Sequence, residues 1–462
     1  MVDKLAIEGG PRTVPEGIIK PWPWITEEER QAVLDVISDP GGWLPAPYGP
    51  RPDPRELLEK EWADYVGVKY CVSASSGTSA LHLAVAAAGV GPGSEVIVPA
   101  FTFLSSASCI LHQNGVPIFV DIDPKTYNID PNRIEEKITD KTKAIMAVHL
   151  HGLPVDMDEI NDIARKHNLV VIGDVAQSQG SLYKGRKVDA LSDIAACSII
   201  VGKNLSCGTE GGLFTTDDEE FYERAKRMRE FGEVIRPGER RVYNALGMGW
   251  NYRMTFFAAA FARCQLRKLD RLNELRRENC EYLSRHLGEI EGVEPPYVPP
   301  DRTHVYFFFV LRLKMDRLGI KVREERDELG LNPHAAKFRT AIERALNAEG
   351  VPIGQWQTVP VPSQSVFQFK DGYGLGCPWS CPFYTNSIEP FHTPVIYRNE
   401  DYPETLRLID EYLMISRITP PNDLSLMKLY VEAFRKVFDN IERVKDMAKT
   451  IELTWPFAPS RR

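Results

Sequence analysis

The stretch Leu169-Val-Val-Ile-Gly173-Asp174-Val-Ala-Gln177 joins a continuous apolar run to a polar end. A strand that carries apolar side chains in succession has both faces buried, as in a parallel sheet that helices cover on both sides. The surrounding chain fits this arrangement, because short apolar runs alternate with amphipathic stretches of helical length from Tyr70 to Thr216. Such alternation is typical of βαβ units. The sequence therefore predicts an α/β fold with a mostly parallel sheet sandwiched by helices.

The expected strands of this sheet span residues 70–74, 95–99, 116–121, 143–148, 169–173 and 195–201. Helices are expected between them, for example over residues 78–88 and 156–167. Ligands of open α/β sheets bind beyond the carboxyl ends of the strands. Polar residues that directly follow these strands are therefore the candidates for a functional site.

The last third of the chain has a different pattern and predicts a smaller α+β domain. A long helical pattern over 255–287 leads into it, and a Pro-rich connection follows. One strand is expected over 304–313, and helices are expected over 334–349, 402–414 and 425–449. We therefore expect a large domain with an N-terminal arm over residues 1–270 and a smaller C-terminal domain over 271–462. Residues 359–382, rich in Pro, Gly and aromatics, are expected to be an irregular excursion.

Composition excludes several classes of function. The chain has 462 residues, 43% hydrophobic and 26% charged, with a formal net charge of −8. Nucleic acid is not expected as a partner, because phosphate binding relies on concentrated Lys and Arg. The sequence contains no apolar run of membrane-spanning length and no secretory signal, so we expect a cytoplasmic protein with no membrane partner. Its eight cysteines do not resemble a disulfide framework, and Cys377 and Cys381 lack a second pair at zinc-ligand spacing, so no metal site is expected.

The first candidate for chemistry is Ser75-Ser76-Gly77-Thr78-Ser79, between an expected strand and an expected helix. Small residues at a helix start let backbone N–H groups approach an anion, and the hydroxyls add further donors. Taken alone, however, the stretch is more typical of an ordinary helix N-cap.

The second and third candidates are a carboxylate and an amine. Asp174 ends a buried strand, where a carboxylate is costly unless it meets a positive partner such as a protonated pyridine nitrogen. At about 4 Å and an effective dielectric of about 20, that attraction is worth about 4 kcal/mol. A helix N-cap is the equally weighted alternative for Asp174.

Lys203 follows an apolar strand in a Gly-rich turn, so its amine should be desolvated and its pKa lowered, which favours Schiff-base chemistry. A fourth stretch, Gly249-Trp-Asn251-Tyr-Arg253-Met254, places two polar residues among aromatics and is uninformative in isolation.

Taken in order, these stretches resemble the pyridoxal-5′-phosphate (PLP) dependent sugar and cyclitol aminotransferase family of DegT/DnrJ/StrS type. The resemblance is close over residues 22–272 and looser through Tyr402-Pro403-Glu404. Further stretches that resemble the family are residues 87–93, 98–103, 121–124 and 148–152. The resemblance implies the aspartate-aminotransferase fold, with a large sheet of the seven-stranded type, and PLP as the cofactor.

Carried over residue by residue, the resemblance assigns roles at the cofactor ring. It implies that Lys203 holds the cofactor as a Schiff base and moves a proton during the reaction. Asp174 would pair with the pyridine nitrogen, Gln177 would bond the ring hydroxyl, and Phe103 would stack on the ring.

The resemblance also implies a phosphate site formed by Gly77, Thr78 and Ser198. Asn251 matches a residue that one subunit gives to the phosphate of its neighbour, so a homodimer is implied. The chain departs from the family at Ile199, at Gly173, and by one additional residue between Lys203 and Glu210, and these departures concern the substrate pocket. Some family members replace the lysine with histidine and act as dehydratases, and the presence of Lys203 argues against that branch.

The expected function is therefore the transfer of an amino group from glutamate or glutamine to a keto-sugar or keto-cyclitol, in amino sugar or aminocyclitol biosynthesis. The alternative within PLP chemistry is a dehydratase, epimerase or aromatising enzyme on a related cyclic keto compound. An alternative of another class is a non-catalytic PLP-fold regulator or partner subunit, which intact Lys203, Asp174 and Gln177 disfavour. A nicotinamide-dependent dehydrogenase is disfavoured further, since no Gly-x-Gly-x-x-Gly follows the first strand.

Overall fold

A seven-stranded sheet forms the centre of the computed structural model, which describes residues 3–39, 52–236, 239–322, 326–389 and 392–453. In spatial order its strands are β1 (Tyr70–Ala74), β9 (Gly212–Thr216), β8 (Ile194–Ser198), β5 (Val170–Asp174), β4 (Thr142–Val148), β2 (Glu95–Pro99) and β3 (Val116–Val120). Strands β8, β5, β4, β2 and β3 are parallel, whereas β9 runs antiparallel to both β1 and β8. The predicted mostly parallel sheet is confirmed.

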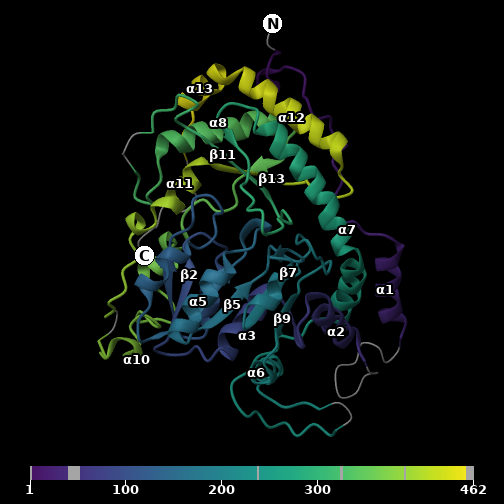
Figure 1. The fold of residues 1–462 in the computed structure, drawn as a ribbon, viewed down its shortest axis with the longest axis vertical. Coiled ribbons are helices and arrows are strands. Elements are labelled where there is room, and N and C mark those ends of the chain that lie inside the picture. Colours follow the sequence, from purple (N-terminus) through teal and green to yellow (C-terminus); the bar gives the residue numbers. More distant parts are fainter. Residues whose placement is uncertain (1–2, 40–51, 237–238, 323–325, 390–391, 454–462) are drawn as a thin grey trace.

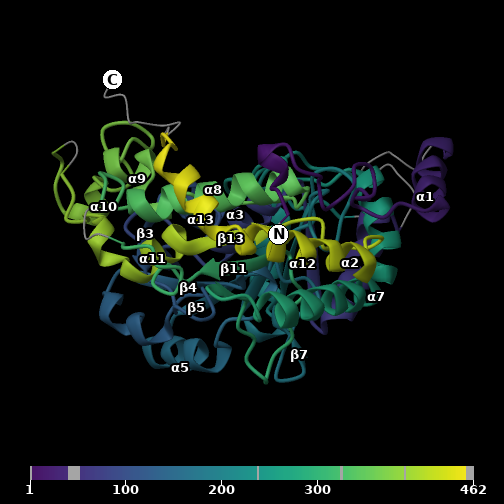
Figure 2. The same cartoon turned by 90° about the horizontal axis from the view of Figure 1, so that it is seen from above.

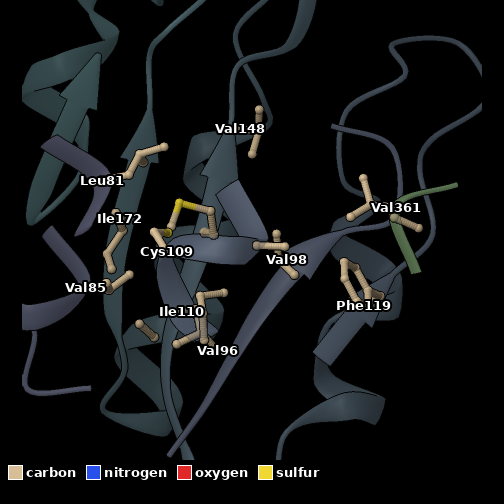
Figure 3. Packing of buried hydrophobic residues seen from close by; sticks show 14 of the residues in the cluster. Leu81, Val85, Val96, Val98, Cys109, Ile110, Phe119, Val148, Ile172 and Val361 are labelled. Atoms are coloured by element: carbon tan, nitrogen blue, oxygen red, sulfur yellow. The ribbon is translucent and has the colours of Figure 1, made fainter. Parts of the chain in front are cut away.

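Helices cover both faces of this sheet. Successive side chains of each strand point to opposite sides, so an apolar strand presents apolar side chains to both layers of helices. One face packs against α3 (Gly77–Ala87), α4 (Ser105–His112) and α6 (Glu219–Arg229), and Figure 3 shows Val96 and Val98 of β2 beside Ile110 and Cys109 of α4. Ile97 points the other way, into the cluster that contains α2 (Pro54–Val66), α5 (Met157–His167) and the start of α7 (Phe256–Leu287). Two apolar layers therefore bury the sheet, as the apolar strands predict.

A second, antiparallel sheet lies in the last third of the chain. Its order is β10 (Val293–Glu294), β11 (Phe309–Leu313), β13 (Tyr412–Ile415) and β12 (Ile353–Gly354). Helices α8 (Pro333–Glu349), α11 (Pro403–Glu411), α12 (Leu424–Asp439) and α13 (Ile441–Lys449) complete this half. Helix α7 has 32 residues and runs from one half to the other, as Figure 1 shows.

Three expectations for the second half were wrong in detail. The strand expected over 304–313 is shorter, since only Phe309–Leu313 joins the sheet. The helix expected over 402–414 ends at Glu411, and the next four residues form β13, paired with β11. The helix expected over 425–449 is interrupted at Asn440, whose side-chain amide donates to the carbonyl oxygen of Asp3.

The N-terminal segment packs against the second half and against α7. At the N-terminus, Leu5 and Val14 belong to the apolar cluster of the second sheet, and the buried Glu349 carboxylate accepts hydrogen bonds from the backbone N–H groups of Ala6 and Thr13. Helix α1 (Glu27–Ser38) lies at the outer side of α7, as Figures 1 and 2 show.

The described residues from 359 to 397, which begin with the Pro- and aromatic-rich excursion, pack on the large sheet. Within this segment, α9 (Ser365–Phe369) and α10 (Pro382–Thr385) are short helices. Phe367 contacts Phe119 of the edge strand β3 with ring centroids 5.1 Å apart, and Tyr397 Oη donates to the carbonyl oxygen of Pro117 at 2.8 Å. Figure 3 shows Val361 of this segment beside Phe119. The excursion therefore covers the edge strand of the large sheet, whose unpaired backbone would otherwise be open to other strands.

No helix among the described residues is both long enough and apolar enough to span a bilayer.

Candidate active site

The candidate residues gather at one edge of the large sheet. Asp174 and Ser198 are the last residues of the neighbouring strands β5 and β8, Lys203 lies in the turn after β8, and Gly77 begins α3. The carboxyl ends of parallel strands meet at the same edge of a sheet, which is where open α/β sheets bind their ligands. The order of the strands thus brings together residues that are more than 120 positions apart in the sequence.

Asp174 is a buried carboxylate, only 5% exposed, that the protein supports on both oxygens. Its Oδ2 accepts a hydrogen bond from Ser106 Oγ at 2.7 Å, and its Oδ1 accepts one from the Ala176 N–H at 3.0 Å. Burial raises the pKa of the Asp174 carboxyl, while these two bonds and the nearby Lys203 charge act in the opposite direction. Because burial disfavours the charged form of this carboxyl, a cationic group bound beside it would be stabilised by the carboxylate.

Lys203 is partly buried, and desolvation lowers the pKa of its amine to about 8, against the raising effect of the Asp174 charge. Its backbone is fixed, since its N–H donates to Ile200 O at 2.9 Å and its carbonyl accepts from Trp22 Nε1 at 3.0 Å. Its Nζ lies 4.1 Å from the centroid of the Phe307 ring. An amine with a pKa near 8 exchanges a proton readily at neutral pH, as a nucleophile or general base must.

Gly77 forms one wall of a cradle at the start of α3. A Cβ at this position would lie 2.4 Å from Ser198 Cβ, so only glycine permits this approach. Ser76 caps the helix by accepting from the Ser79 N–H, and Thr78 Oγ1 lies 2.7 Å from Ser105 Oγ. The first N–H groups of a helix have no partner within the helix and carry its positive dipole end, which suits them to an anion.

Gln177 is 6% exposed and has a defined orientation. Its Oε1 accepts the backbone N–H of His151 at 2.6 Å, so its NH₂ group is left as the donor for another acceptor. His151 itself adopts a left-handed backbone conformation with φ of 56°. Its ring Nε2 accepts from Trp356 Nε1 at 3.1 Å, and its carbonyl accepts from the Phe307 N–H at 2.8 Å.

Phe103 and Asn251 are the two predicted site residues that are exposed. The Phe103 ring, in the loop after β2, is 59% exposed. Asn251 is exposed as well, although its neighbour Tyr252 accepts the Ser75 N–H through its carbonyl at 2.7 Å. Asn251 is therefore one residue away from a backbone contact with the Ser75–Ser79 stretch, and its side chain is not buried within this chain.

Two of the positions at which the chain departs from the family have a backbone or packing reason to be glycine or to contain one. A Cβ at Gly173 would lie 2.5 Å from Ser192 Oγ, so a larger residue would displace Ser192. The turn between Lys203 and Glu210 contains Gly208 with φ of 74°, a conformation that favours glycine. Gly208 belongs to the turn that presents the amine, whereas Gly173 lies in β5 directly before Asp174.

Sequence reasoning missed four residues of this site. They are Ser105, Ser106, His151 and Phe307, which contact Thr78, Asp174, Gln177 and Lys203 respectively. The two serines follow the expected strand 95–99 by a few residues, so hydroxyls near that strand end were an available signal. His151 lies in the stretch 148–152 that resembles the family, although no role was predicted for it, and Phe307 carried no signal.

A family model for the DegT/DnrJ/EryC1/StrS aminotransferase family matches residues 23–389. The chain belongs to this family. GDP-perosamine synthase of Caulobacter vibrioides is 36% identical over 308 residues, covering 64% of this chain and 82% of that protein. L-glutamine:2-deoxy-scyllo-inosose aminotransferase of Streptomyces lividus is 37% identical over 327 residues, covering 69% of this chain and 76% of that protein. The expectation of an aminotransferase is confirmed.

Solved structures agree with the fold. A crystal structure of 3-amino-5-hydroxybenzoic acid synthase superimposes with a TM-score of 0.76 and 27% identity, covering 93% of this chain and all of that one. The aminotransferase from Psychrobacter cryohalolentis superimposes with a TM-score of 0.74 and 28% identity, covering 92% of this chain and all of that one. The DegT-type aminotransferase fold predicted by the resemblance is confirmed.

Proposed function

We propose that this protein transfers an amino group from glutamate or glutamine to a keto-sugar or keto-cyclitol, with PLP as its cofactor and Lys203 as the amine that holds it. The observation that carries the proposal is the placement of Lys203 and Asp174 beside the Gly77–Ser198 cradle at one sheet edge, in a chain of this family. The relatives support the substrate class, since one is named for perosamine synthesis and another for amination of 2-deoxy-scyllo-inosose with L-glutamine.

The residues present fit the cofactor that the family implies. Gly77, Thr78 and Ser198 would hold its phosphate, because the cradle is too narrow for a side chain at position 77 and combines helix N–H groups with hydroxyls. When bound, PLP supplies an aldehyde that condenses with amines and a ring that withdraws electrons.

The remaining positions suit the ring. Asp174 would meet the ring nitrogen, since its two hydrogen bonds hold the carboxylate in place and the carboxylate is buried, so a bound cationic ring would stabilise its charge. The free NH₂ group of Gln177 would donate to the ring hydroxyl, and Phe103 would cover one face of the ring.

Lys203 carries the proton transfer. As the free amine, its Nζ would take a proton from the substrate carbon that bears nitrogen, and as the ammonium it would deliver that proton to the C4′ carbon of the cofactor. The pKa of about 8 leaves both forms accessible near neutral pH. The partly buried position of Lys203 limits the access of water to this amine.

The proposal includes a homodimer in which Asn251 serves the neighbouring subunit's phosphate site. Apolar side chains that precede Asn251 are exposed: Val242 at 79%, Tyr243 at 70%, Leu246 at 60% and Met248 at 81%. Exposed apolar side chains gathered in one segment are typical of a protein interface. We further propose that residues 1–270 form the large domain, which binds the cofactor, and that residues 271–462 form the smaller domain.

The test is a donor half-reaction followed by an acceptor half-reaction. The wild-type protein, incubated with PLP, should gain a visible absorption band, and borohydride should fix the cofactor to the peptide that contains Lys203. Lys203→Ala should lose both, whereas Lys184→Ala, which changes an exposed lysine paired with Asp158, should keep both. Glutamate or glutamine should bleach the band, and keto-sugars or keto-cyclitols should restore it with formation of an amine.

The same experiment separates the alternatives. Turnover of a cyclic keto compound without an amino donor would indicate a dehydratase, an epimerase or an aromatising enzyme. Cofactor binding without any turnover would indicate a regulator or partner subunit. A wild-type protein that forms no band and carries no label at Lys203 would contradict the proposal.

A further inference from the structure

The ring of Phe307 faces the amine of Lys203. Nζ lies 4.1 Å from the ring centroid, well within the roughly 6 Å over which an aromatic face attracts a cation. Phe307 comes from the segment that leads into the second sheet, about 100 positions from Lys203 in the sequence, and it is only partly exposed. A partly desolvated cation–aromatic pair is stronger than one on an open surface.

Backbone contacts between the two halves set the position of this ring. The Phe307 N–H donates to His151 O at 2.8 Å, and the Val305 N–H donates to Gly152 O at 3.0 Å. Gly152, with φ of 105°, allows a close approach, since a Cβ there would lie 2.7 Å from Tyr306 N. These bonds replace the strand that the sequence predicts over 304–308, and they hold Phe307 against the Lys203 turn.

Burial and the neighbouring titratable groups determine the charge of Lys203. Burial disfavours the ammonium form, and Asp174 at the end of β5 favours it. Cys197 on β8 is the other titratable group that could act on this amine, but burial raises the pKa of its thiol well above the usual value, so it is neutral and contributes no charge. When Asp174 is paired with the cofactor ring, the aromatic face of Phe307 is the remaining favourable neighbour of the ammonium among these groups.

We propose that Phe307 is an active-site residue whose ring face binds the Lys203 ammonium whenever that amine is not bonded to the cofactor. This rests on the proposed function, which makes Lys203 the amine that is bonded and released. The ring stabilises the protonated amine after Lys203 has taken a proton from the substrate, and it keeps the amine beside the substrate carbon. Because the pairing favours the charged form, it raises the pKa of Lys203 relative to an aliphatic neighbour.

The test measures the charge of Lys203 in the protein freed of its cofactor. PLP is added between about pH 6 and pH 10, and the early amount of label fixed to Lys203 by borohydride is followed by peptide mass spectrometry. Only the free amine reacts, so the rate rises with pH through the pKa of Lys203. Phe307→Leu removes the aromatic face and should lower the midpoint by roughly 0.5 to 1 pH unit. Phe307→Tyr keeps a ring face and should stay near the wild-type midpoint.

Two further variants distinguish a loss of the aromatic face of Phe307 from a general loss of folding. A trifluorinated phenylalanine at position 307 keeps the shape of the ring and withdraws charge from its face, so the midpoint should fall as in Phe307→Leu. Phe308→Leu removes the neighbouring ring, whose centroid lies 4.1 Å from that of Phe307, and should retain the wild-type midpoint.

The outcomes separate this inference from the proposed function. An unchanged midpoint in both Phe307→Leu and the fluorinated protein would overturn the role of Phe307, and so would an equal shift in Phe308→Leu. Label that is absent from Lys203 in the wild-type protein would instead overturn the proposed function.

Discussion

Ser106 Oγ donates a hydrogen bond of 2.7 Å to Oδ2 of Asp174. The serine lies in α4 and the aspartate at the end of β5, 68 positions later in the chain. Thr102 Oγ1 lies 2.8 Å from the same serine oxygen, so a short hydroxyl chain supports the buried carboxylate. Hydrogen bonds to the charged form of a carboxyl favour that form. The charged form of Asp174, which the proposed mechanism requires, is therefore stabilised by the hydroxyl group of Ser106 in α4.

Ser106→Ala should weaken cofactor binding without removing it. The lost hydrogen bond to a charged group is worth about 1.5–3 kcal/mol, and we expect the Kd for PLP to rise roughly 10-fold or more. Titration of the cofactor-free protein, followed by visible absorption, measures this. Ser108→Ala on the same helix should bind PLP like the wild type. Equal affinities in the two variants would mean that Ser106 does not support Asp174.

Gly77→Ala should damage both cofactor binding and stability. The added methyl group would lie 2.4 Å from Ser198 Cβ, and such overpacking costs about 1–3 kcal/mol. Because the same shift of Ser198 widens the cradle, we expect a loss of PLP affinity of roughly 10-fold or more. Denaturant unfolding and PLP titration measure the two effects.

Gly91→Ala is the matched control for this change, since no atom lies within 4 Å of a Cβ at Gly91. It should leave both quantities unchanged. A Gly77→Ala protein with wild-type affinity would show that the narrow approach to Ser198 has no part in phosphate binding.

Lys203→Met should alter the pH dependence of stability in the cofactor-free protein. The pKa of Lys203 is lowered from 10.5 to about 8 in the folded state, so between these values the unfolded chain binds a proton that the folded chain lacks. The free energy of unfolding of the wild type should therefore gain a contribution as pH rises from about 8 to 10.5. Lys203→Met should lack this contribution and should be more stable than the wild type below pH 8.

Urea unfolding of the cofactor-free proteins at several pH values measures this difference. Lys4→Met, which changes an exposed lysine, should follow the wild-type curve. Parallel curves for the wild type and Lys203→Met would mean that the folded protein does not lower the pKa of this amine.

Trp356→Phe should disturb the cofactor environment more than the fold. It removes the Nε1–H that donates to His151 Nε2, and His151 orients both the Gln177 amide and the Phe307 backbone. The loss of one hydrogen bond should cost about 1 kcal/mol of stability. We expect the visible band of the bound cofactor to shift and its pH titration to move, because the Gln177 donor is no longer held. Trp24→Phe, at a residue that is 42% exposed, should change neither spectrum nor stability, and an unshifted spectrum in Trp356→Phe would contradict this role of His151.

Much of the large sheet could be predicted from the sequence because its strands are buried on both faces. The strands expected at 70–74 and 95–99 are observed with those bounds, and the others differ by at most three residues at an end. A continuous apolar run that is bounded by small or polar residues and is too short for a helix is best explained as a buried strand. Asp174, Lys203 and the Ser75–Ser79 stretch followed from the same pattern, because polar residues that end parallel strands share one edge. The other site residues were predicted only through the resemblance to the family.

Only the tertiary structure decided the second sheet and the residues that contact Asp174 and Lys203, and the physical reason is the same in each case. Residues 412–415 continue an apolar pattern that suits a helix, and they form a strand because Phe309–Leu313 offers them ladder hydrogen bonds. Residues 304–308 lose their expected ladder to bonds with His151 and Gly152. Ser106 and Phe307 reach Asp174 and Lys203 from distant segments. Periodicity records how each segment buries its own faces, whereas these contacts depend on which segments become neighbours, and that is set by the packing of the whole chain.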